Sequence, residues 1–150
     1  MSSDLLTLLV RSAAAEEVHL RVIETPEDRQ AVAVLMRAAD AVEHIDPRLP
    51  ASNILDAKQR LVLFTAPDTR LGWLRTGEAL QRVWLEISRS GLWASPLVQL
   101  TEVAETREAL CAELNLTTTP QVLLRIGPAS MIGCSGRRSV QDVLIDSGPR

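Results

Sequence analysis

The pattern of apolar and polar positions predicts helices and short strands in turn. Apolar residues recur every three or four positions over residues 4–17, which favours an amphipathic helix. The segment 19–24 alternates apolar and polar residues, as a half-buried strand does. Thr25 precedes a proline and two acidic residues, which is typical of a helix start, so a second helix is expected over residues 26–44. The two prolines within residues 46–53 then indicate a connection.

A long helix dominates the middle of the chain. It follows a compact apolar run over residues 60–66 that suits a buried strand. Asp68 or Thr69 is expected to cap this helix, and Gly91 to end it. A charged face lies opposite an apolar stripe, which we interpret as core-facing because tryptophans usually dominate core burial. The stripe comprises Trp73, Gly77, Leu80, Trp84, Ile87 and Gly91, and the charged face comprises Arg75, Glu78, Arg82, Glu86 and Arg89.

The last third of the chain continues the alternation of strands and helices. Residues 95–100 follow the long helix and are expected to be a strand or an extended segment. A helix is expected over residues 104–116, a clear strand over 120–127, and a loop over 129–139. Because helices separate single strands throughout, the pattern predicts a layered α/β or α+β domain.

Length and composition limit the number of domains and the classes of partner that are expected. A chain of 150 residues, 46% of them hydrophobic, is expected to form a single domain over residues 1–150 with a substantial core. The net charge of −3 gives no basic footprint for nucleic acid, and a chain with no Tyr and a single Phe is a poor base-stacking platform. Nucleic acid is therefore not an expected partner.

Targeting features point to the cytoplasm. The N-terminal stretch MSSDLLTLLVRSAAAEEV has an early acidic residue and no long apolar core, unlike a signal peptide. The longest apolar runs are too short to span a bilayer, so no membrane association is expected. Two cysteines far apart in the sequence do not make a disulfide framework. We therefore expect a cytoplasmic protein.

The segment IGCSGRRS is the best candidate for anion binding. Gly133 and Gly136 allow backbone N–H groups to turn toward an anion, and Arg137 and Arg138 supply charge and forked donors. Adjacent arginines in a loop are also common as plain solvated surface. The residues alone leave both readings open.

Other reactive residues have simpler interpretations. His19 and His44 lack partners at metal-ligand spacing, so solvent-facing or capping roles are favoured. Cys111 falls on the apolar side of its helix and is expected to be a small core residue. Cys134 lies near arginines that could lower its pKa, but a plain loop cysteine is favoured. No catalytic triad, phosphate-binding loop or dinucleotide fingerprint is present.

Four segments, taken in order, resemble a known family. They are LFTAPDTRLGWLRTGEALQRV, SGLWASPLVQLTEV, LTTTPQVLLRIG and GRRSVQDVL. Together they are similar to the C-terminal half of the FMN-dependent nitroreductase-like proteins, in the two-lobed branch in which one chain mimics the usual homodimer. The resemblance implies an α+β fold with helices packed on a small mixed or antiparallel sheet, here as a half-length copy.

The resemblance also implies a site. In the family, the long helix packs along the pseudo-dimer interface, and the turn after it presents backbone groups to the flavin ring. The matching positions are Ser95, Pro96, Leu97 and Val98. Arg137 matches the family's phosphate-binding arginine, with Arg138 as the adjacent basic position. The family's N-terminal phosphate and FMN-clamping motifs are not visible, and Ser135 and Ser139 replace a usual lysine and proline.

Three functional hypotheses follow from the resemblance. The first is an FMN-dependent NAD(P)H oxidoreductase whose flavin site is completed by a second chain, either a homodimer partner or another nitroreductase-like half. The second is a non-catalytic flavin-binding or storage protein. The third is a degenerate interaction partner without flavin. Flavin supplies hydride chemistry by itself, so no protein acid or base is required by the first hypothesis.

Overall fold

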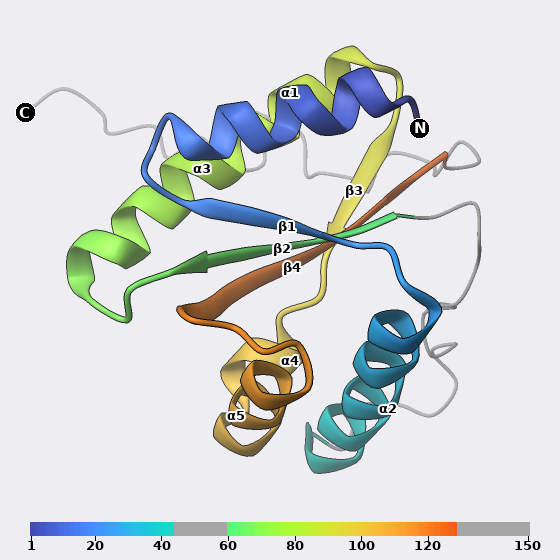
Figure 1. Cartoon of the computed structure of the whole chain (residues 1–150), viewed down its shortest axis with the longest axis vertical. Coiled ribbons are helices and arrows are strands. Elements are labelled where there is room, and N and C mark those ends of the chain that lie inside the picture. The colour runs from blue at the N-terminus through green and yellow to red at the C-terminus, as the bar shows by residue number, and fades with distance from the viewer. Residues whose placement is uncertain (44–59, 129–150) are drawn as a thin grey trace, which may run out of the picture.

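The computed structural model describes residues 1–43 and 60–128, which form one four-stranded sheet with helices on both of its faces (Figure 1). This arrangement confirms the expected α+β class. The strands are β1 (His19–Ile23), β2 (Arg60–Ala66), β3 (Trp93–Pro96) and β4 (Thr119–Gly127). The helices are α1 (Ser3–Ala14), α2 (Pro26–Glu43), α3 (Arg70–Arg89), α4 (Gln99–Glu102) and α5 (Ala104–Glu113).

The sheet is antiparallel, with the strand order β1-β2-β4-β3. The two inner strands, β2 and β4, are far apart in sequence, and Val62 pairs with Leu124 between them. Ala94 of β3 pairs with Ile126, so β3 lies at one edge of the described sheet. The antiparallel alternative of the predicted "mixed or antiparallel" sheet is therefore the one observed.

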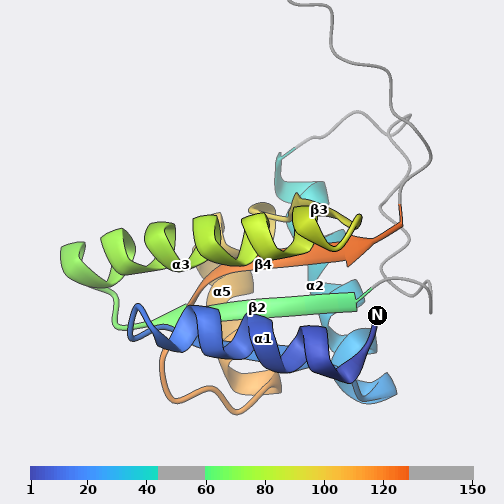
Figure 2. The same ribbon diagram turned by 90° about the horizontal axis from the view of Figure 1, so that it is seen from above.

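Two helical layers enclose the sheet. Helices α1 and α3 run side by side over one face, whereas α2, α4 and α5 cover the other (Figures 1 and 2). Each layer closes its own apolar core, so the inner strand β2 is buried on both faces and reads as a nearly continuous apolar run, whereas β4 also carries the half-buried polar residues Gln121 and Arg125. The first core includes Leu9, Ala13, Val62, Phe64, Val83, Ile87 and Leu124, and the second includes Ile23, Val32, Leu61, Leu97, Leu100, Leu110 and Leu123.

The stripe predicted to bury α3 is confirmed for three of its six residues, Leu80, Trp84 and Ile87, and is wrong for Trp73, Gly77 and Gly91. Of its members, Ile87 is buried, Leu80 and Trp84 are half-buried, and Trp73 is 54% exposed. Gly77 is exposed as well. The face that contacts the sheet is instead rotated toward smaller side chains, because a helix lying close to a sheet has little room for indole rings. The buried residues of α3 are Gly72, Thr76, Ala79, Val83 and Ile87.

Gly72 shows how closely α3 approaches its neighbours. A Cβ atom at this position would lie 2.0 Å from the carbonyl oxygen of Pro67. The Thr69 hydroxyl caps the helix by accepting from the Gly72 N–H at 3.1 Å, as the sequence predicts. The first turn of α3 therefore requires glycine, whereas Gly77 has open space beside it.

The charged face of α3 lies along α1. Arg75 forms an ion pair with Glu17, and Arg82 forms one with Glu16, both just beyond the end of α1. These contacts orient α3 on the sheet and leave its tryptophan-bearing flank on the other side of the helix. That flank, called the tryptophan flank below, comprises the exposed residues Trp73 and Gly77 and the half-buried Trp84, which packs against the first core.

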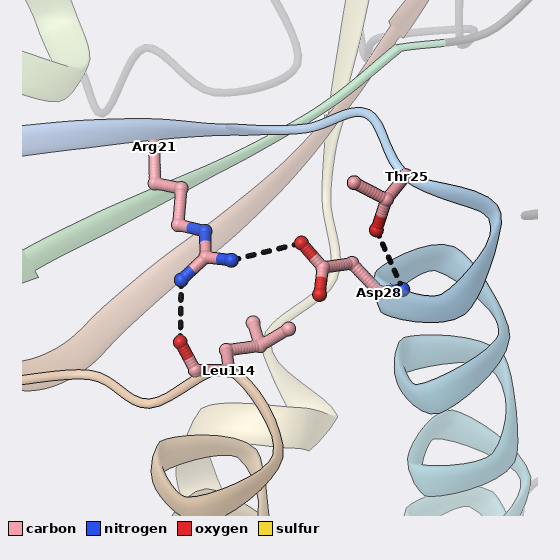
Figure 3. Close-up of polar contacts among 4 residues, drawn as sticks. All are labelled: Arg21, Thr25, Asp28 and Leu114. Carbon is pink, nitrogen blue, oxygen red and sulfur yellow. Dashed lines mark hydrogen bonds and ion pairs between the residues drawn. The ribbon is translucent and has the colours of Figure 1, made fainter.

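Arg21 ties the opposite layer together (Figure 3). It extends from β1, and its guanidinium donates to Asp28 Oδ2 at 2.8 Å and to the backbone carbonyl of Leu114 at the end of α5. The Thr25 hydroxyl accepts from the Asp28 N–H at 3.0 Å and caps α2, which confirms the predicted helix start. One half-buried cation thus joins a strand and two helices.

Element boundaries depart from the sequence prediction in three places, one of which is helix α5, which ends at Glu113 rather than at residue 116. Helix α1 ends at Ala14 rather than near Glu17, which has a positive φ of 57°. The segment predicted as extended over residues 95–100 is divided between β3 and the short helix α4. Helix α4 was missed because four residues are too few to show a helical period.

Candidate functional site

The end of α3 delivers the chain into the edge of the sheet through a tight reversal. Gly91 adopts a left-handed conformation with φ 70°. Its N–H donates to the Ser88 carbonyl at 3.1 Å, and the Leu92 N–H donates to the Ile87 carbonyl at 3.2 Å. This pair of hydrogen bonds is the Schellman arrangement that ends helices at glycine. The predicted helix end at Gly91 is confirmed, and it fixes where β3 begins.

The four predicted ring-contact residues form a short strip at the edge of the described sheet. Ser95 and Pro96 pair with Arg125 and Leu124 of β4. Pro96 is exposed and has no N–H to donate, which suits an edge strand. Leu97 is buried, and Val98 is exposed. Residues 95–98, called the edge strip below, therefore alternate anchored and accessible positions.

Hydrogen bonds hold the edge strip at its far end. The Leu97 N–H donates to the Leu123 carbonyl at 2.8 Å, which extends the attachment to β4 by one residue. The Val98 carbonyl accepts from the N–H groups of Thr101 at 2.9 Å and Glu102 at 3.0 Å, and from the Thr101 hydroxyl at 3.0 Å. The backbone around Pro96 and Val98 is thus preorganised, which lowers the entropy cost of binding a rigid ligand.

Gln99 follows the edge strip and carries an unusual feature. Its side-chain oxygen, Oε1, is buried and has no hydrogen-bond partner among the described residues. A buried amide oxygen left unpaired costs about 1–3 kcal/mol. Gln99 was not predicted to be a site residue, although a polar residue between the apolar positions Leu97 and Leu100 was the signal available.

Helix α3 also carries exposed apolar side chains. Trp73 is exposed, but its indole N–H donates to Asp68 Oδ1 at 2.7 Å, so the ring has a fixed hydrogen-bond anchor. Leu71, Leu74 and Leu85 on the same helix are more than half exposed. At the end of α3 a pocket of about 460 Å³ opens beside β3. It is lined by Trp84, Ser88, Gly91, Leu92, Trp93 and Ala94.

Within residues 1–43 and 60–128, the histidine and the cysteine lie outside the edge strip. No group of three or more His, Cys, Asp or Glu residues in this part could hold a metal ion. His19 is exposed, in keeping with the solvent-facing role predicted for it. Burial raises the pKa of the Cys111 thiol, Arg107 opposes that rise and Glu108 adds to it. Cys111 was expected to be a small core residue, but its side chain is only half-buried.

The predicted anion site lies outside the described residues. The described part of the chain ends at residue 128, and the predicted site comprises Gly133, Cys134, Gly136, Arg137 and Arg138. His44 also lies outside the described residues. The structure therefore places the edge strip and Gln99 in succession at the end of β3, while the phosphate contact stays a prediction.

Sequence comparisons find relatives over about half of the chain. No protein-family model matches it. Two Mycobacterium tuberculosis proteins named as putative NAD(P)H nitroreductases align with it. One is 41% identical over 80 residues and the other, acg, is 36% identical over 74 residues. These alignments cover 53% and 49% of this chain but 22% of each relative. The similarity thus spans about a fifth of the relatives' length.

Structural comparisons extend over almost the whole chain. The NfrA1 nitroreductase of Bacillus subtilis superimposes with a TM-score of 0.67 at 16% identity, covering 99% of this chain and 67% of that one. The NADPH:FMN oxidoreductase of Vibrio harveyi, in complex with NAD+, gives 0.67 at 14% identity, covering 100% and 70%. The fold expected from the resemblance is therefore confirmed. Across residues 1–43 and 60–128, no helix has the length and apolarity needed to cross a membrane.

Proposed function

We propose that this chain, which belongs with the nitroreductase-like proteins, binds FMN and acts as an NAD(P)H-dependent oxidoreductase whose flavin site is completed by a second chain. The observation that carries the proposal is the edge strip. A flat ring needs a fixed, partly apolar backbone beside it, and the strip offers exposed Pro96 and Val98 between anchors at Ser95 and Leu97.

The residues present fit a flavin ring on chemical grounds. Pro96 and Val98 supply apolar contact without charge, and the unpaired Gln99 oxygen supplies an unused hydrogen-bond acceptor next to them. Flavin, when bound, supplies the hydride chemistry, and the protein supplies orientation and polarity.

The phosphate would be held by the Gly133–Arg138 loop. Arg137 gives a charge-assisted, forked hydrogen bond to a phosphate oxygen, and Arg138 adds a second cation. Backbone N–H groups near Gly133 and Gly136 would complete the anion site. This contact is part of the proposal and rests on the sequence.

A second chain would cover the tryptophan flank of α3. Large exposed apolar patches on soluble proteins usually mark interfaces. Trp73, Gly77 and Trp84 lie along one flank of the helix, and open space beside Gly77 allows a partner backbone to approach closely. We propose a homodimer, or pairing with another nitroreductase-like half, acting in the cytoplasm. NAD(P)H is the proposed reductant, in keeping with the names of the relatives.

Two alternatives share the fold. A flavin-storage protein would bind FMN but leave it oxidised in the presence of NAD(P)H. An interaction partner without flavin would bind no FMN. The edge strip favours flavin binding over the second alternative, because a remnant without ligand has no need for a preorganised exposed turn.

The experiment is a titration of the purified full chain with FMN, followed by flavin fluorescence, and then anaerobic addition of NADH or NADPH. The proposal predicts saturable binding and bleaching of the flavin absorption band. Binding without bleaching would select the storage protein, and the absence of binding would select the interaction partner.

A further inference from the structure

The side-chain oxygen of Gln99 is a buried acceptor that lacks a donor among the described residues. Most buried polar side-chain atoms in proteins have at least one hydrogen-bond partner. An exception placed directly after the edge strip calls for a physical explanation. The strongest one is a donor that arrives with a ligand.

The backbone on both sides of Gln99 is held in place. Leu97 is buried and hydrogen-bonded to Leu123, and Leu100 is fully buried. The Leu100 carbonyl accepts from the Thr106 hydroxyl at 3.2 Å, which attaches α4 to α5. Helix α4 also packs against α2 and β4. Gln99 therefore cannot reach a donor by a shift of its backbone without breaking these contacts.

The chemistry of a primary amide defines the ligand group that would match it. Its oxygen accepts, and its nitrogen carries two donors beside that oxygen. The complementary surface is an N–H flanked by a carbonyl. The pyrimidine edge of a flavin has this pattern, with N3–H between two carbonyl groups, and it has no charge that would need a counter-ion.

We propose that the Gln99 amide accepts a hydrogen bond from N3–H of the flavin and thereby fixes the orientation of the ring on the edge strip. This inference rests on the proposed function, since it requires that FMN binds. It assigns a binding role to a side chain that neither the sequence pattern nor the resemblance indicated.

The test compares FMN with FMN methylated at N3, which has no N3–H. Both are titrated into the full-length protein, into Gln99→Leu and into Gln30→Leu, a control at an exposed position on α2. The wild type and Gln30→Leu should bind the methylated flavin about three- to tenfold more weakly than FMN, the range for one neutral hydrogen bond. Gln99→Leu should bind FMN weakly and should not distinguish the two flavins.

Thermal unfolding without flavin separates a ligand contact from a structural one. Because Oε1 has no described partner, Gln99→Leu should unfold at the same temperature as the wild type or higher. A large fall in melting temperature with unchanged FMN affinity would overturn the inference, because the amide would then serve the fold. If Gln99→Leu fails to fold, Gln99→Met takes its place as a variant closer in shape.

The outcomes also separate this inference from the proposed function. If the wild type binds both flavins equally well, the Gln99 contact is wrong while FMN binding stands. If the wild type binds neither flavin, the proposed function itself fails and the inference fails with it. A loss of self-association in Gln99→Leu, with flavin affinity intact, would place the donor on a second chain and overturn the flavin contact.

Discussion

Leu97 donates its backbone N–H to the carbonyl of Leu123 at 2.8 Å, one residue beyond the end of β3. This bond attaches the edge strip to an inner strand of the sheet and leaves its two neighbours, Pro96 and Val98, exposed. A buried structural residue, Leu97, therefore lies between two proposed ligand contacts, Pro96 and Val98, and the two roles can be tested separately.

Substitution of Val98 and Leu97 should separate binding from stability. Val98→Ala removes an exposed side chain and should change the free energy of unfolding by no more than about 0.5 kcal/mol, while weakening FMN binding measurably. Leu97→Ala removes a buried side chain and should cost about 2–5 kcal/mol of stability. Chemical denaturation and flavin fluorescence give the two readouts. Equal FMN affinity in the wild type and Val98→Ala would contradict the ring contact.

The two glycines of α3 should respond in opposite ways to alanine. Gly72→Ala places a Cβ against the Pro67 carbonyl and should destabilise the protein, because backbone must move to admit it. Gly77→Ala has open space and should stabilise the isolated chain by about 1 kcal/mol through helix propensity. Denaturant titration measures both.

Gly77→Ala also tests the proposed interface. If a second chain packs closely against the tryptophan flank, the added methyl group should weaken self-association at micromolar concentration. Sedimentation velocity of the wild type and Gly77→Ala provides the measurement. A wild type that sediments as a well-behaved monomer would contradict the interface, whatever the variant does.

Much of this fold follows from local patterns in the sequence. The caps at Thr25 and Thr69 and the helix end at Gly91 are local chemistry, so the pattern placed them correctly. The central strands were also predictable, because burial on both faces leaves a continuous apolar run in β2. The pairing of the strands could not be predicted in this way, because β2 and β4 are far apart in sequence and come together only in the folded chain.

The orientation of α3 shows why part of the site was missed. Trp73 and Trp84 are the largest side chains of the helix, and the pattern assigned them to the core. The sheet instead contacts Ala79 and Val83, because close approach favours small side chains. The unpaired oxygen of Gln99 could not be predicted either, because the lack of a hydrogen-bond partner is a property of the packed structure rather than of residue order.

Arg21 should contribute more to stability than an exposed arginine. Its side chain is 31% exposed and that of Asp28 is 20% exposed, so their ion pair is screened only in part. Arg21→Met removes the hydrogen bonds to Asp28 and Leu114 and should cost about 1.5–3 kcal/mol. Arg89→Met is the control, because Arg89 is 78% exposed. Equal melting temperatures for the two variants would show that the Arg21 cluster is not stabilising.

Neither cysteine should be needed for flavin reduction. The thiol of Cys111 should ionise at a higher pH in the folded protein than in the denatured chain. In Cys134→Ser, the remaining thiol at Cys111 has a pKa raised by burial, so less thiolate is present at any given pH. Its alkylation rate should therefore rise at higher pH in the folded protein than in the denatured chain. A pH series with an alkylating reagent measures this, and a lower midpoint in the folded protein would contradict it.

Flavin reduction by NAD(P)H should survive the Cys134→Ser substitution, because flavin chemistry needs no thiol. The rate of bleaching of bound FMN provides the comparison with the wild type. If the substitution abolished reduction while FMN affinity stayed unchanged, the thiol would take part in the reaction and the mechanism would be wrong.

The proposed flavin site is tested most directly by a pair of titrations, with FMN and with riboflavin, on the wild type and on Arg137→Ala. The wild type should bind both flavins, and Arg137→Ala should bind FMN about ten- to a hundredfold more weakly, because one charge-assisted contact is lost. Riboflavin, which has no phosphate, should bind both proteins equally. An equal loss of both ligands would mean that Arg137 serves the fold, and no binding of either flavin by the wild type would contradict the flavin site altogether.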